Sequence, residues 1–241
     1  MEAISFVVPA YNEERLLGAT LDAIHAAARE IARPYEVVVV NDASSDETPA
    51  IARAQGARVV DCQHRQIARV RNTGARASTG DIVIFVDADT IVSATVLRAS
   101  LAALHDGAVG GGATVGIEGP QPWWGPALLF TVIESMRVMR WAAGCYIFCT
   151  RAAFDAAGGF DERLFVAEEI ALSRALQRVG RFVILRERVI TSGRKMRTHS
   201  AWDLVRLLAG FVRHGPALLR SRERLSLWYG ERRHDPPQLD G

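Results

Sequence analysis

The sequence has few cysteines, and their number does not fit a disulfide framework. Cys62, Cys145 and Cys149 are its three cysteines, which form no C-x-x-C pair and include one more thiol than pairing can use. Small secreted domains are stabilised by paired cysteines, which extracellular and periplasmic compartments keep oxidised. The cysteine content therefore indicates a reducing compartment.

Long apolar runs are also missing. The most apolar later stretch, Trp123 to Cys149, is interrupted by Glu134, Arg137 and Arg140, which makes it too polar for an ordinary spanning helix. The first residues, Met1 to Pro9, lack the basic start of a signal peptide. We therefore expect a soluble, cytoplasmic protein.

The chain has no strong excess of either charge, since its formal net charge is +2 over 241 residues. Such a balance does not indicate a general nucleic-acid binder. The glycine cluster Gly110 to Gly112 lacks the G-x-G-x-x-G spacing of a dinucleotide-binding turn, which argues against a dehydrogenase. The charge is uneven, because Arg186 to His234 contains twelve Lys and Arg against four Asp and Glu.

Short apolar runs alternate with amphipathic segments over the first 90 residues. Runs of β-branched residues predict strands, and apolar residues spaced by three and four predict helices. Strands are expected at 4–8, 35–40, 59–60 and 82–86, and helices at 16–24, 51–54 and 67–77. This alternation predicts an α/β fold with a mostly parallel central sheet flanked by helices.

The pattern is less regular after residue 90. Helices are expected at 95–104, 126–142, 152–156, 168–179 and 202–219, and strands at 145–150 and 182–185, with a glycine-broken strand pair at 109–117. The last helix is amphipathic and basic, so it either packs on the domain or lies on an anionic membrane.

The most informative motif is Asp87-Ala88-Asp89, at the end of the apolar run Ile82 to Val86. Open α/β sheets bind ligands at the carboxyl ends of their strands. Two acids one residue apart point to opposite faces of a strand, so they can share a metal ion only if the chain turns there, and Thr90 and Ser93 suit such a turn. A solvated turn is the alternative interpretation.

Several blocks in order resemble the motifs of family 2 glycosyltransferases. The blocks are Val7 to Glu14, Val38 to Asp46, Arg71-Asn72 through Gly80-Asp81 to Asp89, Gly158 to Glu162, and Glu168-Glu169 to Arg174 and Gly180. The resemblance implies a single GT-A domain over 1–200, with a nucleotide-binding half at 1–89 and an acceptor half at 90–200, followed by a basic amphipathic helical tail at 201–241. It also implies transfer of a sugar from a nucleotide-diphosphate donor, with Mg²⁺ or Mn²⁺.

The resemblance assigns roles to particular residues. It makes Asp89 the leading metal ligand, with Asp87 acting through water or on the ribose and His199 as a further ligand, and it makes Glu169 the base, with Glu168 beside it. The donor-binding residues that it implies are Pro9, Ala10, Tyr11, Glu13, Asp42, Arg71, Asp87, Ala88, Arg194 and Lys195. Related enzymes usually have Glu-Asp where this chain has Glu168-Glu169. Arg65, Arg69 and Arg76 are expected on a solvated helix face.

Structural alternatives exist for most of these residues. Asp42 is also suited to a turn or a helix cap, and Glu13, Glu168 and Glu169 to the first turn of a helix, where the dipole favours acids. His199 also suits an ordinary surface or core position. The residue types therefore allow both interpretations.

Three functions remain compatible with the sequence. A glycosyltransferase, with UDP preferred to GDP in the donor and a small-molecule or lipid-linked acceptor, fits the motifs best, and peripheral contact at the inner face of the membrane would suit the lipid acceptor. A nucleotidyltransferase would have a glycine-rich basic loop after the first strand, where this chain has Pro9 to Glu14. A non-catalytic nucleotide-sugar-binding protein is the third option.

Overall fold

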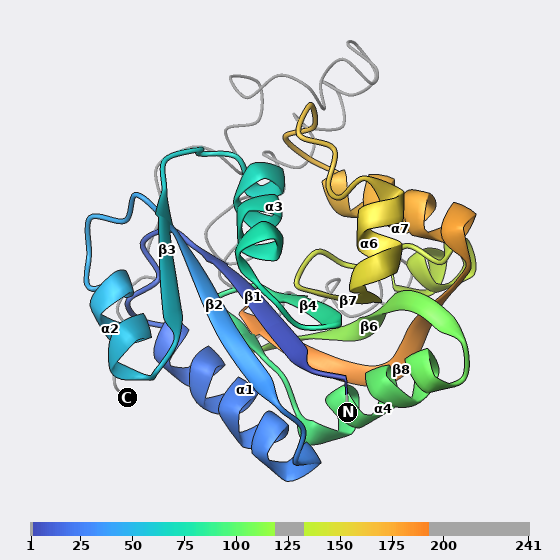
Figure 1. Ribbon diagram of the computed structural model, residues 1–241, viewed down its shortest axis with the longest axis horizontal. Coiled ribbons are helices and arrows are strands. Elements are labelled where there is room, and N and C mark those ends of the chain that lie inside the picture. The colour runs from blue at the N-terminus through green and yellow to red at the C-terminus, as the bar shows by residue number, and fades with distance from the viewer. Residues whose placement is uncertain (1, 119–132, 193–241) are drawn as a thin grey trace, which may run out of the picture.

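The computed structural model describes residues 2–118 and 133–192, which form one mixed sheet between two layers of helices (Figure 1). The order of the strands in the sheet is β3-β2-β1-β4-β7-β6-β8-β5. The strands are β1 (Ile4–Ala10), β2 (Tyr35–Asp42), β3 (Arg58–Cys62), β4 (Ile82–Val86), β5 (Thr90–Ile91), β6 (Ala108–Glu118), β7 (Tyr146–Thr150) and β8 (Arg181–Ser192). The helices are α1 (Leu17–Ile31), α2 (Thr48–Ala54), α3 (Ile67–Ala77), α4 (Ala94–His105), α6 (Arg151–Ala157) and α7 (Glu168–Val179), and residues 133–139 are also helical.

The sheet changes direction at β4. β1 pairs in parallel with β2 and β4, and β2 pairs in parallel with β3, as the alternation of strands and helices predicts. β7 pairs antiparallel with β4 on the other side. The α/β prediction is confirmed, and the switch from parallel to antiparallel neighbours falls at the strand that carries Asp87 and Asp89.

The strands are apolar on both faces because helices cover both faces. In β1, Phe6 and Val8 belong to the core cluster that includes α1 and α4, and Val7 belongs to the cluster that includes α3, α6 and α7. Figure 1 shows these two helical layers on either side of the sheet.

Several expected elements differ from the structure, and α1 extends to Ile31 where a helix was expected at 16–24. β1 continues through Pro9 to Ala10, because its pairing with β4 ends at Val7 and a proline is tolerated where a strand has lost one neighbour. Residues 108–118 form one strand with two register shifts instead of a strand pair. β8 is longer than expected and pairs at its end with β5, a strand that the sequence analysis did not predict.

Some expected features lie outside the described residues. They are the tail at 201–241 with its helix at 202–219, the end of the proposed domain at 200, and the first part of the helix expected at 126–142. Within residues 2–118 and 133–192, no helix combines the length and the hydropathy needed to cross a bilayer.

Gly74 lies where α3 packs against the sheet, and replacing it by alanine is expected to destabilise the fold. A Cβ at this position would lie 2.8 Å from Val40 Cγ2 and closer still to Val7 Cγ1. Overpacking of this kind typically costs about 1–3 kcal/mol, which exceeds the gain of up to about 1 kcal/mol from the better helix propensity of alanine. Urea denaturation of Gly74→Ala should show this loss.

Gly18 in α1 provides the matched control. A Cβ there would meet its nearest atom, Gln55 Nε2, at 3.5 Å, an ordinary contact. Gly18→Ala should therefore leave the free energy of unfolding unchanged or raise it by about 0.5–1 kcal/mol. Equal effects of the two substitutions would contradict the close packing of α3.

Candidate active site

The acidic motif forms a turn at the end of β4. Asp87 N donates to Cys145 O at 3.1 Å, and Thr90 N donates to Asp87 O at 3.1 Å, so the chain reverses within the motif. Ala88 is buried, and its carbonyl accepts from Thr20 Oγ1 at 3.0 Å. The turn that two acids need in order to share an ion is therefore present.

The end of β8 holds the second acid of the motif. Thr191 Oγ1 donates to Asp89 Oδ1 at 3.3 Å, and Ser192 N donates to Asp89 O at 3.1 Å. The chain therefore leaves β8 beside Asp89. The predicted functional residues beyond β8, Arg194, Lys195 and His199, lie outside the described residues.

Arg71 connects the first acid of the motif with helix α7. Its Nη2 donates to Asp87 Oδ1 and to Gly144 O, and its Nη1 donates to Glu168 Oε1, each at 2.8 Å. Burial by itself would lower the pKa of Arg71, but the carboxylates of Asp87 and Glu168 raise it, so the guanidinium stays charged. The structure gives Arg71 internal partners, whereas the resemblance implied that it contacts the donor.

The acid pair begins α7, as expected. The residue before it, Ala167, has a left-handed backbone with φ of 63°, and the carbonyl of Glu169 accepts from Ser173 Oγ at 2.8 Å. Burial raises the pKa of Glu168 to about 8, and the neighbouring Glu169 adds to this rise while Arg71 opposes it. Glu168 is buried and tied to Arg71, whereas Glu169 is partly exposed.

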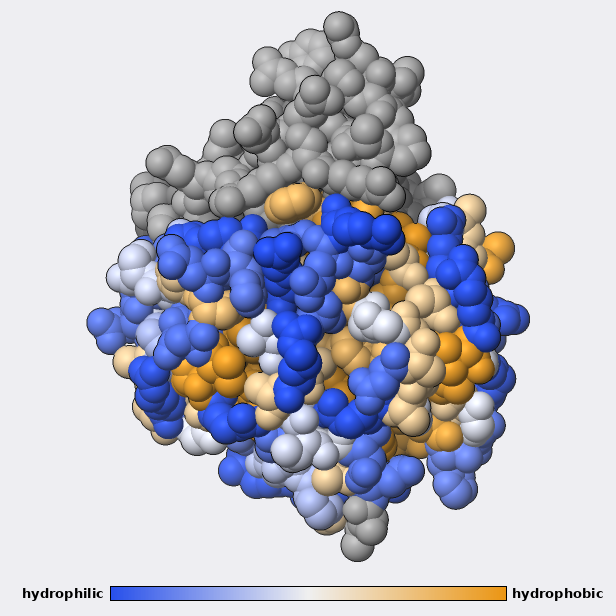
Figure 2. Space-filling model, turned by 45° about the horizontal axis from the view of Figure 1, so that its top comes forward, coloured by the Kyte–Doolittle hydropathy of each residue, from blue (hydrophilic) through white to orange (hydrophobic). Residues whose placement is uncertain are grey.

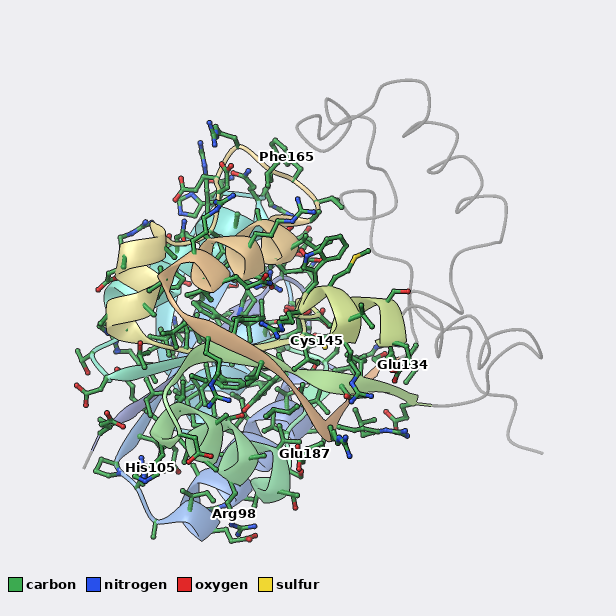
Figure 3. All side chains as sticks on the ribbon, turned by 90° about the vertical axis from the view of Figure 1, so that its right-hand side faces the viewer. Arg98, His105, Glu134, Cys145, Phe165 and Glu187 are labelled. Atoms are coloured by element: carbon green, nitrogen blue, oxygen red, sulfur yellow. The ribbon has the colours of Figure 1, made fainter. Side chains whose placement is uncertain are left out.

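The pKa of the Cys145 thiol is affected by the same carboxylates. Burial raises the pKa of Cys145, and the nearby carboxylates of Asp87 and Asp89 raise it further, so the thiol stays protonated. Cys145, labelled in Figure 3, is partly buried and follows Gly144, whose carbonyl accepts from Arg71 Nη2.

The loops after β1 and β2 lie side by side at the same edge of the sheet. Ala10 pairs with Asn41, and beyond that pair Asn12 N donates to Ser44 Oγ at 3.0 Å and Glu13 N donates to Thr48 Oγ1 at 2.7 Å. The loop that carries Tyr11 and Glu13 therefore lies beside the loop that follows Asp42, and both loops contain residues that the resemblance implies for donor binding.

Asp42 is buried at the end of β2 and accepts three contacts through a single oxygen. Oδ1 accepts from His64 N at 2.6 Å, from Arg65 N at 3.1 Å and from Cys62 Sγ at 3.7 Å. Oδ1 thus holds the loop between β3 and α3 and caps neither α2 nor α3, whose N-caps are Glu47 and Gln66. Within the described residues Oδ2 makes no hydrogen bond, which leaves this oxygen for a ligand.

Two features of this region were missed by the sequence analysis. Arg65 precedes α3 and does not lie on its solvated face, and its guanidinium carbon lies 3.8 Å from the centroid of the Tyr11 ring. Asn72 and Gln66 bind the segment between α6 and α7. The adjacency of Asn72 to Arg71 in a shared block was a signal for the second feature, whereas the stacking of Arg65 had none.

The donor set at the acidic turn fits a hard divalent cation that arrives with a diphosphate. No group of three or more His, Cys, Asp or Glu side chains in the described part of the chain could hold a metal by itself. Mg²⁺ is typically held by one or two carboxylates together with water and substrate phosphates. Asp87 and Asp89 supply such a partial set, although one oxygen of Asp87 is already bound to Arg71.

The surface of the described residues is mixed. In Figure 2, hydrophilic side chains form a broad band with smaller apolar areas between them.

A mixed sheet between two helical layers, with an acidic turn at its central strand, defines a GT-A type glycosyltransferase domain. The chain belongs to the family described as glycosyl transferase family 2, whose model matches residues 5–157. The chain is therefore a glycosyltransferase by family, as its motifs predict.

Curated relatives share part of this region. The undecaprenyl-phosphate 4-deoxy-4-formamido-L-arabinose transferase of Serratia proteamaculans is 32% identical over 97 residues, which cover 37% of this chain and 29% of the relative. That of Pseudomonas paraeruginosa is 35% identical over 97 residues, which cover 37% and 28%. The match thus spans less than a third of the length of these relatives.

Solved structures have the same fold. The mannosyltransferase PcManGT from Pyrobaculum calidifontis, in complex with GDP-Man and Mn²⁺, has a TM-score of 0.65 and 24% identity, over 90% of this chain and 66% of its own. TarS 1-349 of S. aureus, in complex with UDP-GlcNAc, has a TM-score of 0.63 and 20% identity, over 95% of this chain and 70% of its own. At these identities the likeness shows the fold alone.

Proposed function

We propose that this chain is a metal-dependent, inverting glycosyltransferase that moves a sugar from a nucleotide-diphosphate donor to an acceptor hydroxyl. One observation carries the proposal: Asp87 of the acidic turn and Glu168 of the acid pair accept hydrogen bonds from the same guanidinium, each at 2.8 Å. The carboxylates proposed to bind the metal and those of the acid pair proposed to supply the base therefore lie close together at the carboxyl edge of the sheet.

The metal would be Mg²⁺ or Mn²⁺, held by Asp89 and Asp87 with His199 as a further proposed ligand. Such an ion neutralises the charge that develops on a departing diphosphate. PcManGT, which has the same fold, is described with Mn²⁺ in its complex. The carboxylate and diphosphate oxygens are the ligands that these ions prefer.

Glu169 would act as the base. The acceptor oxygen forms a bond to the sugar carbon, the bond from that carbon to the diphosphate breaks, and the acceptor proton moves to the carboxylate of Glu169. The partial exposure of Glu169 supports this assignment, while the burial of Glu168 suits it to holding the start of α7. Attack opposite to the leaving group gives inversion.

The donor would bind along the loops after β1 and β2. Pro9, Ala10, Tyr11 and Glu13 would contact the nucleoside, Ala88 and Asp87 its ribose, and Arg194 and Lys195 the diphosphate. Asp42 Oδ2 would accept the imide N–H of uracil, so we propose UDP as the nucleotide in preference to GDP, although an acid also accepts from guanine. Structures with this fold are described with UDP-GlcNAc and with GDP-Man.

The acceptor would be lipid-linked. The names of the curated relatives carry an undecaprenyl phosphate, which supports an acceptor at a membrane surface. We propose that the chain works in the cytoplasm at the inner face of the membrane, with 1–89 as the nucleotide-binding half, 90–200 as the acceptor half and the basic tail 201–241 contacting the lipid surface.

A panel of nucleotide-sugars tests the proposal. With Mn²⁺, the correct donor at about 100 times its dissociation constant should add about 2.7 kcal/mol of stability, which raises the melting temperature by about 5–11 °C. The same donor should then release its nucleotide diphosphate only when Mn²⁺ is present. Stabilisation without release, in the presence of metal and a range of acceptor lipids, would indicate a non-catalytic nucleotide-sugar-binding protein.

A further inference from the structure

Arg71 is the charged side chain at the centre of the candidate site, and its position does not suit a donor ligand. It is 2% exposed, and its guanidinium carbon lies 5.3 Å from the centroid of the Phe160 ring. Its two terminal nitrogens already donate to three internal acceptors at 2.8 Å. A diphosphate would have to displace those partners in order to reach either terminal nitrogen, and Nε, which has no hydrogen-bond partner in the described residues, is buried.

We propose that Arg71 is a positioning residue: it fixes the distance between the acid of the metal-binding turn, Asp87, and the start of the helix that presents the base, Glu169. This inference rests on the proposed function for the roles of those acids. The bridge itself is independent of that function, because it consists of contacts within the protein.

The shape of the guanidinium suits this role. It is planar and has a fixed fork, so one nitrogen can bind Asp87 while the other binds Glu168. The positive charge of the guanidinium also attracts the carboxyl groups of Asp87 and Glu168, both of which raise the pKa of Arg71. The ammonium of a lysine is a compact point charge and cannot reproduce both contacts in the same geometry.

Two other residues at α3 bind the segment between α6 and α7, which leads to Glu168. Asn72 Nδ2 donates to Phe160 O and Phe160 N donates to Asn72 Oδ1, both at 2.9 Å. Gln66 Nε2 donates to Glu162 O at 2.5 Å and to Leu164 O at 3.0 Å. The segment between α6 and α7 is thus tied to α3 at several points.

Arg71 differs from these neighbours in one respect. Its partners lie on two separate elements that carry proposed catalytic groups, since Asp87 follows β4 and Glu168 begins α7. Asn72 and Gln66 bind only the segment before α7. Arg71 is therefore the contact through which a change in the helix position would reach the acidic turn.

A stability cycle tests the bridge without any substrate. Arg71→Met should lower the melting temperature by about 6–20 °C, because it leaves buried carboxylates without their partner. The double variant Arg71→Met with Glu168→Gln should lose at least about 5 °C less than the sum of the two single variants, because the buried charge is then absent. Strict additivity would overturn the bridge.

Kinetics test the positioning role. Arg71→Lys keeps the charge, so it should recover part of the stability that Arg71→Met loses. Its kcat should nevertheless fall by about 10²-fold, since a misplacement of about 1 Å has an effect of that size. Its affinity for UDP, measured without metal, should stay within about fivefold of the wild-type value, because Arg71 does not touch the nucleotide.

Arg69→Met is the matched control. Arg69 lies on the same helix and pairs with Glu162 of the same segment at 3.4 Å, but its side chain is half exposed. Loss of an exposed pair should change kcat and stability little.

Opposite results separate the two proposals. A tenfold or greater loss of UDP affinity in Arg71→Lys with kcat unchanged would make Arg71 a diphosphate ligand and overturn the inference. A wild-type chain that releases nucleotide from no donor would overturn the proposed function instead, and the stability cycle would still decide the bridge.

Discussion

Glu169→Gln is expected to slow sugar transfer by about 10²- to 10⁴-fold, the usual contribution of a general base. Glutamine has nearly the same shape as glutamate but cannot take a proton from the acceptor hydroxyl. The carbonyl of Glu169, which accepts from Ser173 Oγ, is unaffected by the change, so α7 should keep its start. Single-turnover transfer at saturating donor measures the effect.

Donor binding should survive this substitution, because the proposed nucleotide site lies in the loops after β1 and β2. A thermal shift with UDP that matches the wild-type value would show this. Glu30→Gln is the control, since Glu30 is an exposed residue of α1 that pairs with Arg98. Full transfer by Glu169→Gln would remove Glu169 from the mechanism.

Glu169→Asp refines the test. Related enzymes usually have an aspartate at this position, and the side chain of glutamate is longer by about 1.5 Å, one carbon–carbon bond. The aspartate variant keeps a proton acceptor, so it should retain more transfer than Glu169→Gln. The comparison of the two variants therefore separates the effect of losing the carboxylate on transfer from the effect of shortening the side chain.

Asp89→Asn is expected to lower metal-dependent release of nucleotide diphosphate by about 10³-fold, because a divalent ion supplies several kcal/mol of transition-state stabilisation. The amide oxygen of asparagine can still accept the hydrogen bond from Thr191 Oγ1, so the turn should fold normally. Steady-state release with Mn²⁺ measures the loss. Chelation of the metal from the wild-type enzyme should cause a loss of similar size.

The two losses should not add. If Asp89 acts through the metal, then a chelator has little further effect on Asp89→Asn. Asp81→Asn is the control, because Asp81 precedes the other end of β4 and accepts from Ala3 N at 2.9 Å, a contact that asparagine can keep. Asp89→Asn with wild-type release and wild-type metal dependence would refute the assignment of Asp89.

The local sequence pattern was sufficient to predict the bounds of an element whose formation depends on its own residues. The bounds of α3, β4 and α7 agree with those predicted, because each has a clear apolar period or run between residues that end it. The short β5 and the long β8 were not predicted because they depend on each other: Thr90 pairs with Thr191, a residue far away in the chain.

The candidate site also has parts that the local sequence predicts and parts that depend on contacts between distant residues. The acidic turn and the acid pair are recognisable as motifs, and the structure brings Asp87 and Glu168 to one guanidinium. The partners of Arg71 lie 16, 73 and 97 residues along the chain, so no local pattern indicates that its charge is used internally. The packing of Arg65 on Tyr11 depends in the same way on two loops that meet only in the fold.

The change of pairing at β4 has a consequence for how such enzymes diversify. The parallel strands whose loops are proposed to bind the nucleotide end at β4, and the antiparallel neighbour β7 belongs to the later part of the chain. Under the proposed function, insertions or substitutions downstream of β4 can alter which molecule receives the sugar, while the loops proposed to bind the donor stay as they are. New acceptor preferences can therefore arise without rebuilding the first half of the sheet.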